Sequence, residues 1–421
     1  MSIHESIKQW EEENFSDKFT NSTGLPYPKV QGRDYLFSQT INLIQTGCKL
    51  NQDEFNKLSV DLANLIDSTT ATLFNEQKSR LGELCYPLDL IDLIKTPTQN
   101  LSYMRLGFVV DMDGNPKLIE INSQTPSYNF ELEGGTDEAL QLLGKPARDT
   151  KYIAGLMQSL NDQLQLCANS ISKELKDCTI GFLTCDSTED IYEMNYLKRL
   201  VDGLRVTKKT EVCTNLTFDF KQSTSKPFNS NTQTEFDILF NWYPLEFTHE
   251  NPYPDGSYFY DLLKKAMDLK QVSVYNGQSF ISQNKYLLVY IQENELINRE
   301  LMDYWTPSFY TQEDLEKAGI QSWIGKPIWG RQGTGVFGKQ TILGKTTNFN
   351  GDMSDEYYNN QYYIYQQMWN SYPIVIDNIA YKSTLEKFVY KTKDGWKTGG
   401  QGMRVSEENV IDNYSSWLIV N

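Results

Sequence analysis

The sequence predicts a mixed α/β fold of the α+β kind, because helical and strand-like segments alternate along the chain. Apolar residues follow helical spacing over about 33–94 and again over 136–175. Short apolar runs bounded by polar loops are typical of buried strands, and they lie at 178–185, 236–242 and 272–275. A chain of 421 residues has room for two or three domains. We interpret them as an N-terminal helical region with one hairpin (1–175), a Rossmann-like domain (176–280) and a C-terminal domain (281–421).

Composition and charge exclude several classes of function. The formal net charge of −16 disfavours nucleic acid or an anionic membrane as the main partner. Two histidines, His4 and His249, are too few for a multi-histidine metal site, and a Ser-His-Asp or Cys-His catalytic group would depend on His249 alone. The six cysteines show no CxxC spacing, the N-terminus lacks an apolar signal core, and no run approaches about 18 apolar residues. We therefore expect reduced thiols and a cytoplasmic protein.

The first part of the chain combines helices with one hairpin. Helical spacing starts at Leu36 and Ile41 and predicts two or three helices before residue 94. Two strand-like segments, 103–111 and 117–122, flank an Asp-Gly dipeptide at 113–114, which is a strong hairpin signal.

Glu120 and Asn122 lie two residues apart on the return strand of this hairpin. Alternation places Leu118, Glu120 and Asn122 on one face. A carboxylate and an amide oxygen at that spacing can converge on a hard cation such as Mg²⁺. The alternative is a polar edge that faces solvent.

The middle part begins as a β-α unit. The apolar run at 178–185 is followed by polar, acidic residues suited to a helix N-terminus and then by a helical stretch to Gly203. Residues 217–235 are rich in Ser, Thr, Asn and Gln and predict a surface loop. In the last part, Lys285 opens a helix over 286–291, and 361–367 has strong β-propensity.

The stretch 326–339 is the strongest candidate for a ligand-binding loop. It begins with Lys326 and sets Arg331 among glycines that include Gly330 and Gly333. Glycines let a backbone approach an anion closely, and successive free N–H groups form a concave anion site. The loop also contains a Gly-x-Gly-x-x-Gly pattern, but the dinucleotide fingerprint needs a helix to begin there, whereas 339–343 is strand-like. The segment is therefore a phosphate-binding flap or a plain glycine-rich hairpin.

Short motifs in a fixed order extend from about residue 100 to 410. They are Arg105-Leu106-Gly107, Glu120-Ile121-Asn122-x-x-Thr125-Pro126, Tyr243-Pro244-x-Glu246, Asn284-Lys285, Lys326-Pro327-x-x-Gly330-Arg331-x-Gly333, Tyr363-x-Tyr365-Gln366 and Gly402-Met403-Arg404. Together they resemble the synthetase domain of the glutathionylspermidine synthase family, which has an ATP-grasp fold. No amidase sequence precedes them, so we expect the synthetase half alone.

The resemblance implies an ATP-dependent ligase that joins a carboxylate to an amine through an acyl phosphate. It implies ATP and Mg²⁺ as cofactors, a small-molecule or peptide acid and an amine as partners, and a Rossmann-like pre-ATP-grasp domain at 176–280. This chemistry depends on phosphate positioning and charge neutralisation more than on a nucleophilic side chain.

The resemblance also assigns roles by position. Lys285, Lys326 and the flap glycines Gly330 and Gly333 would bind ATP, and Glu120 and Asn122 would hold Mg²⁺. Arg331 would engage the phosphate or the substrate, and Arg105 would steady the transferred phosphoryl group. Gln366 would line the adenine pocket, and Arg404 would face the substrate or the phosphates.

Two departures from the family pattern stand out. The family's Arg-x-Asp is Arg105-Leu106-Gly107 here, which removes one expected metal carboxylate, and Gln332 replaces a flap glutamate. Asp111 or Asp113 could compensate, although Asp113 belongs to the turn. The departures leave the number of metal ions open and favour an alternative, a nucleotide-binding module of the same fold without catalysis. A kinase-type phosphotransferase would share the flap but would need an HRD-like segment, which the sequence lacks.

Overall fold

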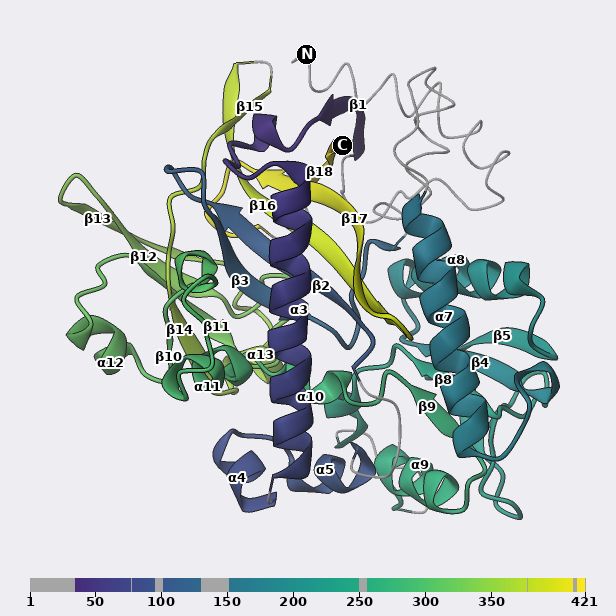
Figure 1. The fold of residues 1–421 in the computed structure, drawn as a ribbon. Coiled ribbons are helices and arrows are strands. Elements are labelled where there is room, and N and C mark those ends of the chain that lie inside the picture. The colour runs from purple at the N-terminus through teal and green to yellow at the C-terminus, as the bar shows by residue number, and fades with distance from the viewer. Residues whose placement is uncertain are drawn as a thin grey trace.

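Three sheets organise the protein, a computed structural model of which describes residues 35–76, 78–94, 101–129, 151–249, 256–376, 378–411 and 415–420. They have seven, five and four strands, and two further short strands pair with each other. Figure 1 shows the seven-stranded sheet at the centre, with the other two on either side. The predicted mixed α/β architecture is confirmed.

The central sheet joins segments from both ends of the chain. Its strands are β1 (Tyr35–Ile41), β2 (Tyr103–Val110), β3 (Pro116–Asn122), β15 (Ile374–Ile376), β16 (Ile379–Thr392), β17 (Gly395–Ser406) and β18 (Ser416–Val420). The order is β1-β18-β17-β16-β2-β3, with β15 paired to β16. The pair β1–β18 is parallel and the others are antiparallel. The predicted hairpin β2–β3 is thus extended by a strand from far later in the chain.

The helical prediction at the start of this region is wrong. Leu36 and Ile41 lie in β1, where Ile41 pairs with Val420 of β18. The strand forms because a distant segment offers its backbone hydrogen bonds, which outweighs a short match to helical spacing. The helices begin later, with α3 (Gln52–Asn75), α4 (Lys78–Glu83) and α5 (Leu88–Ile94), after a 3-10 turn at Ile44–Thr46.

Helix α3 covers one face of the central sheet, and Figure 1 shows it running along β16 and β17. A capping box starts it, because the Asn51 side chain accepts from Asp53 N and Glu54 N while Glu54 accepts from Asn51 N. Phe55, Leu62 and Ile66 on its inner face are fully buried. Burial of each such side chain stabilises the fold by roughly 1.5–3 kcal/mol, so this face holds the helix on the sheet.

The β2–β3 hairpin contains a β-bulge that the sequence pattern did not predict. Gly107 pairs with Glu120 and Phe108 with Leu118, which leaves Ile119 as the extra residue. The prediction that Leu118 shares a face with Glu120 is therefore wrong: Leu118 is buried in the core, whereas Glu120 lines a cavity. The bulge shifts the alternation of side chains between the two faces of β3.

The four-stranded sheet confirms the predicted β-α start. It is parallel, with the order β5-β4-β8-β9, and its strands are β4 (Thr179–Thr184), β5 (Lys209–Thr214), β8 (Ile238–Asn241) and β9 (Ser273–Tyr275). The neighbouring helices are α7 (Lys151–Ser170), α8 (Thr188–Leu204) and α9 (Phe259–Asp268). The Ser187 hydroxyl caps α8 by accepting from Asp190 N. The predicted loop at 217–235 contains the short strands β6 (Phe218–Phe220) and β7 (Pro227–Asn229), and 3-10 turns lie at Leu175–Asp177 and Leu245–His249.

The five-stranded sheet is antiparallel and carries the glycine-rich segment. Its order is β10-β14-β11-β12-β13, with β10 (Ser308–Phe309), β11 (Trp323–Pro327), β12 (Phe337–Ile342), β13 (Lys345–Asn350) and β14 (Tyr363–Gln367). Around it lie α10 (Ser279–Gln283), α11 (Tyr286–Glu293), α12 (Gln312–Lys317), α13 (Glu356–Asn359) and a 3-10 turn at Met302–Tyr304. The helix expected after Lys285 is α11, and the strand expected at 361–367 is β14.

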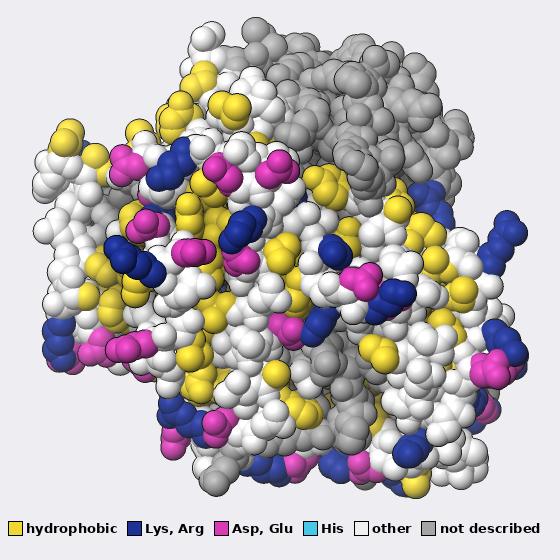
Figure 2. Space-filling model, viewed as in Figure 1, with side chains coloured by type: hydrophobic (Ala, Val, Ile, Leu, Met, Phe, Trp, Pro, Cys, Tyr) yellow, Lys and Arg dark blue, Asp and Glu magenta, His cyan; other side chains and the backbone are white. Residues whose placement is uncertain are grey.

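On the face shown in Figure 2, acidic and basic side chains are interspersed, so the negative charge forms no single patch there. Among the helices described, none combines the length and apolarity required to cross a bilayer.

Candidate active site

The glycine-rich segment forms the predicted strand–loop–strand. Strands β11 and β12 pair antiparallel, with Gly325 opposite Phe337, and the loop between them holds Gln332, Gly333 and Gly335 at φ of 57°, 76° and 71°. A Cβ added to Gly335 would lie 2.7 Å from Pro327 Cγ, so both the backbone angle and the close approach require glycine there. We call residues 328–336 the flap.

All of the predicted site residues meet around one cavity of about 740 Å³ beneath the flap. They are Arg105, Glu120, Asn122, Lys285, Lys326, Gly330, Arg331, Gly333, Gln366 and Arg404. They come from the first and the last parts of the chain, so the fold assembles one site from motifs that are far apart in sequence. Their chemical roles remain predictions.

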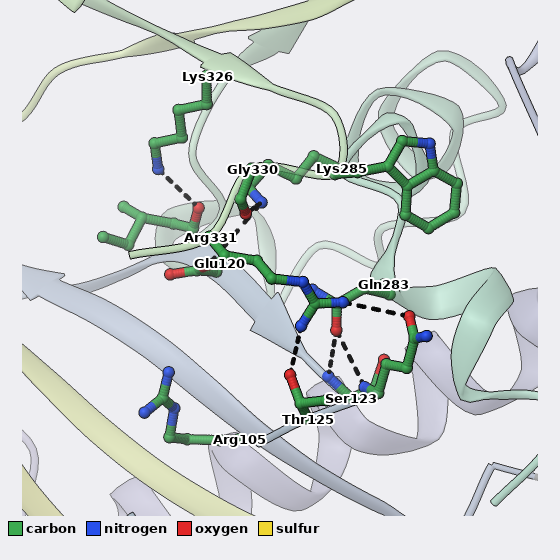
Figure 3. A network of polar contacts seen from close by, with 12 residues as sticks. Arg105, Glu120, Ser123, Thr125, Gln283, Lys285, Lys326, Gly330 and Arg331 are labelled. Carbon is green, nitrogen blue, oxygen red and sulfur yellow. Dashed lines mark hydrogen bonds and ion pairs between the residues drawn. The ribbon is translucent and has the colours of Figure 1, made fainter. Parts of the chain in front are cut away.

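Two buried lysines converge on one carboxylate inside the cavity (Figure 3). Lys285 Nζ donates to Gly330 O at 2.6 Å and lies 3.9 Å from Glu120 Oε1. Lys326 Nζ donates to Ile119 O, at the bulge, at 3.1 Å. The bulge and the flap therefore supply the carbonyl groups that place both ammonium groups beside Glu120.

Burial and the neighbouring charges shift the pKa values of these three groups. Burial lowers the pKa of Lys326 to about 8, although Glu120 opposes the shift, and burial likewise lowers the pKa of Lys285. Burial alone would raise the pKa of Glu120, but four surrounding cationic groups, Lys285 foremost, lower it below its usual value. Glu120 thus stays ionised in a site rich in positive charge.

The loop after β3 is fixed by α10, as Figure 3 shows. Gln283 Oε1 accepts from Ser123 N at 3.0 Å and from Gln124 N at 2.9 Å. With its amide oriented to satisfy its neighbours, Asn122 donates to Thr125 O at 3.2 Å and accepts from Arg105 Nη2 at 3.0 Å. Asn122 is therefore held in position beside Glu120.

Arg331 extends from the flap toward the loop after β3, and Figure 3 shows its guanidinium pointing at Thr125. It also reaches Glu246, in the 3-10 turn Leu245–His249. Its Nη2 donates to Glu246 Oε1 at 2.6 Å and to Gln124 Oε1 at 3.4 Å, and its Nη1 donates to the Thr125 hydroxyl. Glu246 is buried, and its Oε2 has no hydrogen-bond partner within the part of the chain that the structure describes. Sequence reasoning did not count Glu246 as a site residue, although its Tyr-Pro-x-Glu motif was a signal for it.

Arg105 and Arg404 approach each other over the central sheet. Both guanidinium groups lie over the Tyr128 ring, at 4.7 Å and 5.6 Å from its centroid, and both form ion pairs with the buried Glu386 of β16. Sequence reasoning missed Glu386 because no local motif marks it. Asp111, by contrast, accepts from Asp113 N and Asn115 N in the hairpin turn and pairs with Lys117, so neither turn aspartate joins the site.

Gln366 occupies the far side of the cavity on β14. Its Nε2 donates to the Ser308 hydroxyl at 3.0 Å, and its Oε1 is buried without a hydrogen-bond partner among the described residues. A buried acceptor at the edge of a cavity is suited to an amino group of a ligand, which is what the adenine assignment requires.

A comparison with protein families now identifies the chain. The model of the glutathionylspermidine synthase pre-ATP-grasp family matches residues 8–419. The chain belongs to this family. Family membership supports a ligase-like enzyme that takes small-molecule substrates, and it makes ATP the expected nucleotide.

A solved structure agrees with the predicted type of fold. A glutathione synthetase-like effector from Globodera pallida superposes with a TM-score of 0.52 at 10% identity, covering 98% of this chain and 97% of that one. A putative gamma-glutamylcysteine synthetase from Methylobacillus flagellatus gives a TM-score of 0.40 at 7% identity, covering 82% and 85%. Among proteins with curated descriptions, none matches this chain significantly.

Proposed function

We propose that this family member is an ATP-dependent ligase that joins a carboxylate to an amine through an acyl phosphate. The observation that supports it best is the concentration of buried cations beneath a glycine-rich flap: Lys285, Lys326, Arg105 and Arg404 surround Glu120 in a cavity large enough for a nucleotide and a substrate. Such a site is short of negative charge, which a polyphosphate would supply.

The two lysines and the flap would bind the phosphates. An ammonium group has three donors, so Lys285 and Lys326 can each donate to a phosphate oxygen while keeping their carbonyl contacts. Flap residues in the left-handed conformation turn the backbone sharply at Gly333 and Gly335, which brings the flap backbone close to the cavity. These groups would hold the γ-phosphate for attack.

The reaction would then proceed in two displacements. An oxygen of the substrate carboxylate attacks the γ-phosphorus, and ADP leaves. The amine nitrogen next attacks the acyl carbon, phosphate leaves, and one proton is lost from nitrogen. Arg105 and Arg331 would stabilise the negative charge on the transferred group, and Arg404 would orient the acid.

Glu120 and Asn122 offer a donor set that fits Mg²⁺. Both are oxygen donors, both line the cavity, and Glu120 remains ionised. Mg²⁺ is commonly held by one or two protein oxygens together with substrate phosphates. When bound, it would neutralise part of the phosphate charge that develops during transfer.

The end of the cavity beyond Arg331 suits a cationic amine. Trp242, Phe247 and Asp190 line it. Asp190 accepts from Trp242 Nε1 at 3.0 Å and from the Ser187 hydroxyl at 2.7 Å, and burial raises its pKa. A protonated amine would be attracted by this carboxylate and by the aromatic faces.

The experiment that tests the proposal measures ADP release with a panel of acids and amines, followed by mass spectrometry of the products. The proposal predicts ADP formation that depends on both co-substrates and a product whose mass equals the acid plus the amine minus water. A stable phosphorylated product would instead identify a phosphotransferase.

Gly107 favours one alternative, a nucleotide-binding module without catalysis. In that case ATP would bind tightly, binding would not depend on Mg²⁺, and no acid–amine pair would stimulate ADP release. Calorimetric titration of ATP with and without Mg²⁺, carried out beside the turnover assay, separates the two functions.

A further inference from the structure

Glu386 occupies an unusual position in the central sheet. It lies on β16 between two glycines, with Gly107 of β2 opposite it on one side and Gly402 of β17 on the other. Neither neighbour has a side chain, so the carboxylate has room on the cavity side of the sheet. A Cβ built on Gly107 would lie 3.4 Å from Glu386 Oε2 and 3.5 Å from Glu120 Cβ. A carboxylate at residue 107 would therefore compete with that of Glu386 for the same space.

The Glu386 carboxylate binds both arginines. It is 1% exposed. Its Oε1 accepts from Arg404 Nε at 3.1 Å and Nη2 at 2.9 Å and from the Thr384 hydroxyl at 3.0 Å, and its Oε2 lies 3.3 Å from Arg105 Nε. Two buried guanidinium groups that both lie over the Tyr128 ring would repel each other without this carboxylate.

Glu386 is separated from the cavity by the groups it holds. Arg105, Arg404, Glu120 and Asn122 line the cavity, whereas Glu386 lies behind them and is not among the lining residues described. Its carboxylate is thus placed to orient arginines, and not to reach a metal ion that binds with the nucleotide.

We propose that Glu386 is a positioning residue that uses the space left open at Gly107, and that it holds Arg105 and Arg404 as one preformed double-arginine site for an anionic group of the substrate. The protein ligands of the metal are then Glu120 and Asn122 alone. A carboxylate therefore remains at this point of the sheet although residue 107 lacks one, and its role is to position the arginines. This inference rests on the proposed function for its kinetic measurement only.

Substitutions that move the carboxylate from Glu386 on β16 to residue 107 on β2 test the proposal. The variants are Gly107→Asp, Glu386→Gln and the double substitution. Gly107→Asp alone places a second carboxylate against the first, and Glu386→Gln alone leaves two arginines without a counter-charge, so each should lower Tm by at least about 4 °C. The double variant returns one carboxylate to the space between the arginines, and its Tm should exceed that of either single variant. Additive losses, or a Tm raised by Gly107→Asp alone, would overturn the proposal.

Binding of Mn²⁺ with ADP, followed by electron paramagnetic resonance, tests the metal assignment. Glu386→Gln should leave Mn²⁺ affinity within about threefold of the original protein, whereas Glu120→Gln should weaken it by roughly 10–100-fold. An equal loss in both variants would make Glu386 a metal ligand and refute its positioning role. Neither this measurement nor the Tm cycle needs an acid or an amine, so both outcomes stand even if the ligase assay fails.

The kinetic measurement separates positioning from stability. Glu386→Gln should lower acid-dependent ADP release by at least about tenfold with ATP affinity nearly unchanged, because only the arginines lose their orientation. Gly107→Asp in that background should restore most of the rate. If the rate of ADP release in the variants changed only in step with Tm, and the double variant did not recover it, Glu386 would have only a structural role.

Discussion

The flap and the floor of the cavity are built in opposite ways. The flap is one local loop between β11 and β12, in which charge and conformation come from residues close in sequence. The floor lies across β17, β16, β2 and β3, where Gly402, Glu386, Gly107 and Glu120 form one row. They are neighbours only because strands from both ends of the chain pair. A local element can be recognised by its composition, whereas a site assembled across a sheet depends on register.

The flap side and the floor also differ in the partners of their charged side chains. On the flap side, Lys326 and Arg331 are tied to groups that a substrate could replace or supplement, namely a backbone carbonyl and Glu246. On the floor, Arg404 and Glu386 form a buried pair that stays within the protein. The flap side is therefore suited to engage and release a ligand, and the floor to keep a fixed arrangement.

The largest expected effect comes from removing a flap-side cation. Lys326→Ala and Arg331→Ala should each lower turnover by roughly 100-fold or more, because each removes a positive charge placed where phosphate charge develops. Steady-state ADP release measures the loss, and circular dichroism checks the fold. Lys345→Ala, an exposed position on β13, is the matched control. Near-normal turnover in both cavity variants would refute the flap assignment.

On the floor, Glu120→Gln should have a smaller effect on turnover and lower it by roughly tenfold when Mg²⁺ is saturating. The same substitution should have a larger effect on the Mg²⁺ concentration required, which should rise. The substitution keeps the size of the side chain and removes its charge among four cations. A titration of ADP release against Mg²⁺ measures both quantities. An unchanged Mg²⁺ requirement would remove Glu120 from the metal site and leave it only as a counter-charge for the lysines.

The sequence was most informative where structure is local. The flap, the hairpin around Gly114 and the β-α start at 178–203 were all predicted, because turn glycines, strand runs and a helix cap lie within a few residues of one another. The fold class and the family also followed, since the motifs keep their order. Lys285, at the start of α11, was placed correctly relative to its helix for the same reason.

The features that the sequence did not predict depend on pairing between segments that are far apart in the chain. β1 is a strand because β18 lies beside it, and no pattern near Leu36 indicates that partner. The bulge at Ile119 shifts alternation without a glycine to mark it. Glu386 looked like any polar residue on a strand, and its function emerges only when Gly107 is seen opposite it. A missing side chain on one strand can be read only together with the strands that flank it.

A pH titration sharpens the contrast between the two regions. In the proposed function, phosphate binding requires protonated Lys326, whose pKa burial lowers to about 8, whereas the floor arginines stay charged throughout. ATP affinity of the free protein should therefore fall as pH rises through 8, and Lys326→Arg should abolish that fall. Isothermal titration from pH 7 to 9.5 measures it. A flat profile in the original protein would mean that Lys326 does not bind phosphate.

The stability of the unliganded protein should change in the opposite direction over the same range. The folded-state pKa of Lys326 lies below its usual value of 10.5, so the unfolded chain binds more protons between about pH 8 and 10.5, and this residue's contribution to the free energy of unfolding rises with pH. Chemical denaturation of the original protein and Lys326→Arg at several pH values isolates that contribution.

The smallest effect is expected at the tip of the β12–β13 hairpin, outside the cavity. Ile342 pairs with Lys345, so Leu343 and Gly344 form a two-residue turn at φ of 50° and 76°. Both central residues of such a turn need positive φ, and Asn-Gly is the preferred sequence, whereas leucine is strained there and fully exposed. Leu343→Asn should therefore stabilise the protein by about 0.5–1 kcal/mol, measured by denaturant titration, and leave ADP release unchanged. A change in turnover would mean that the hairpin tip takes part in closing the flap, and the functional part of the five-stranded sheet would then extend beyond residues 328–336.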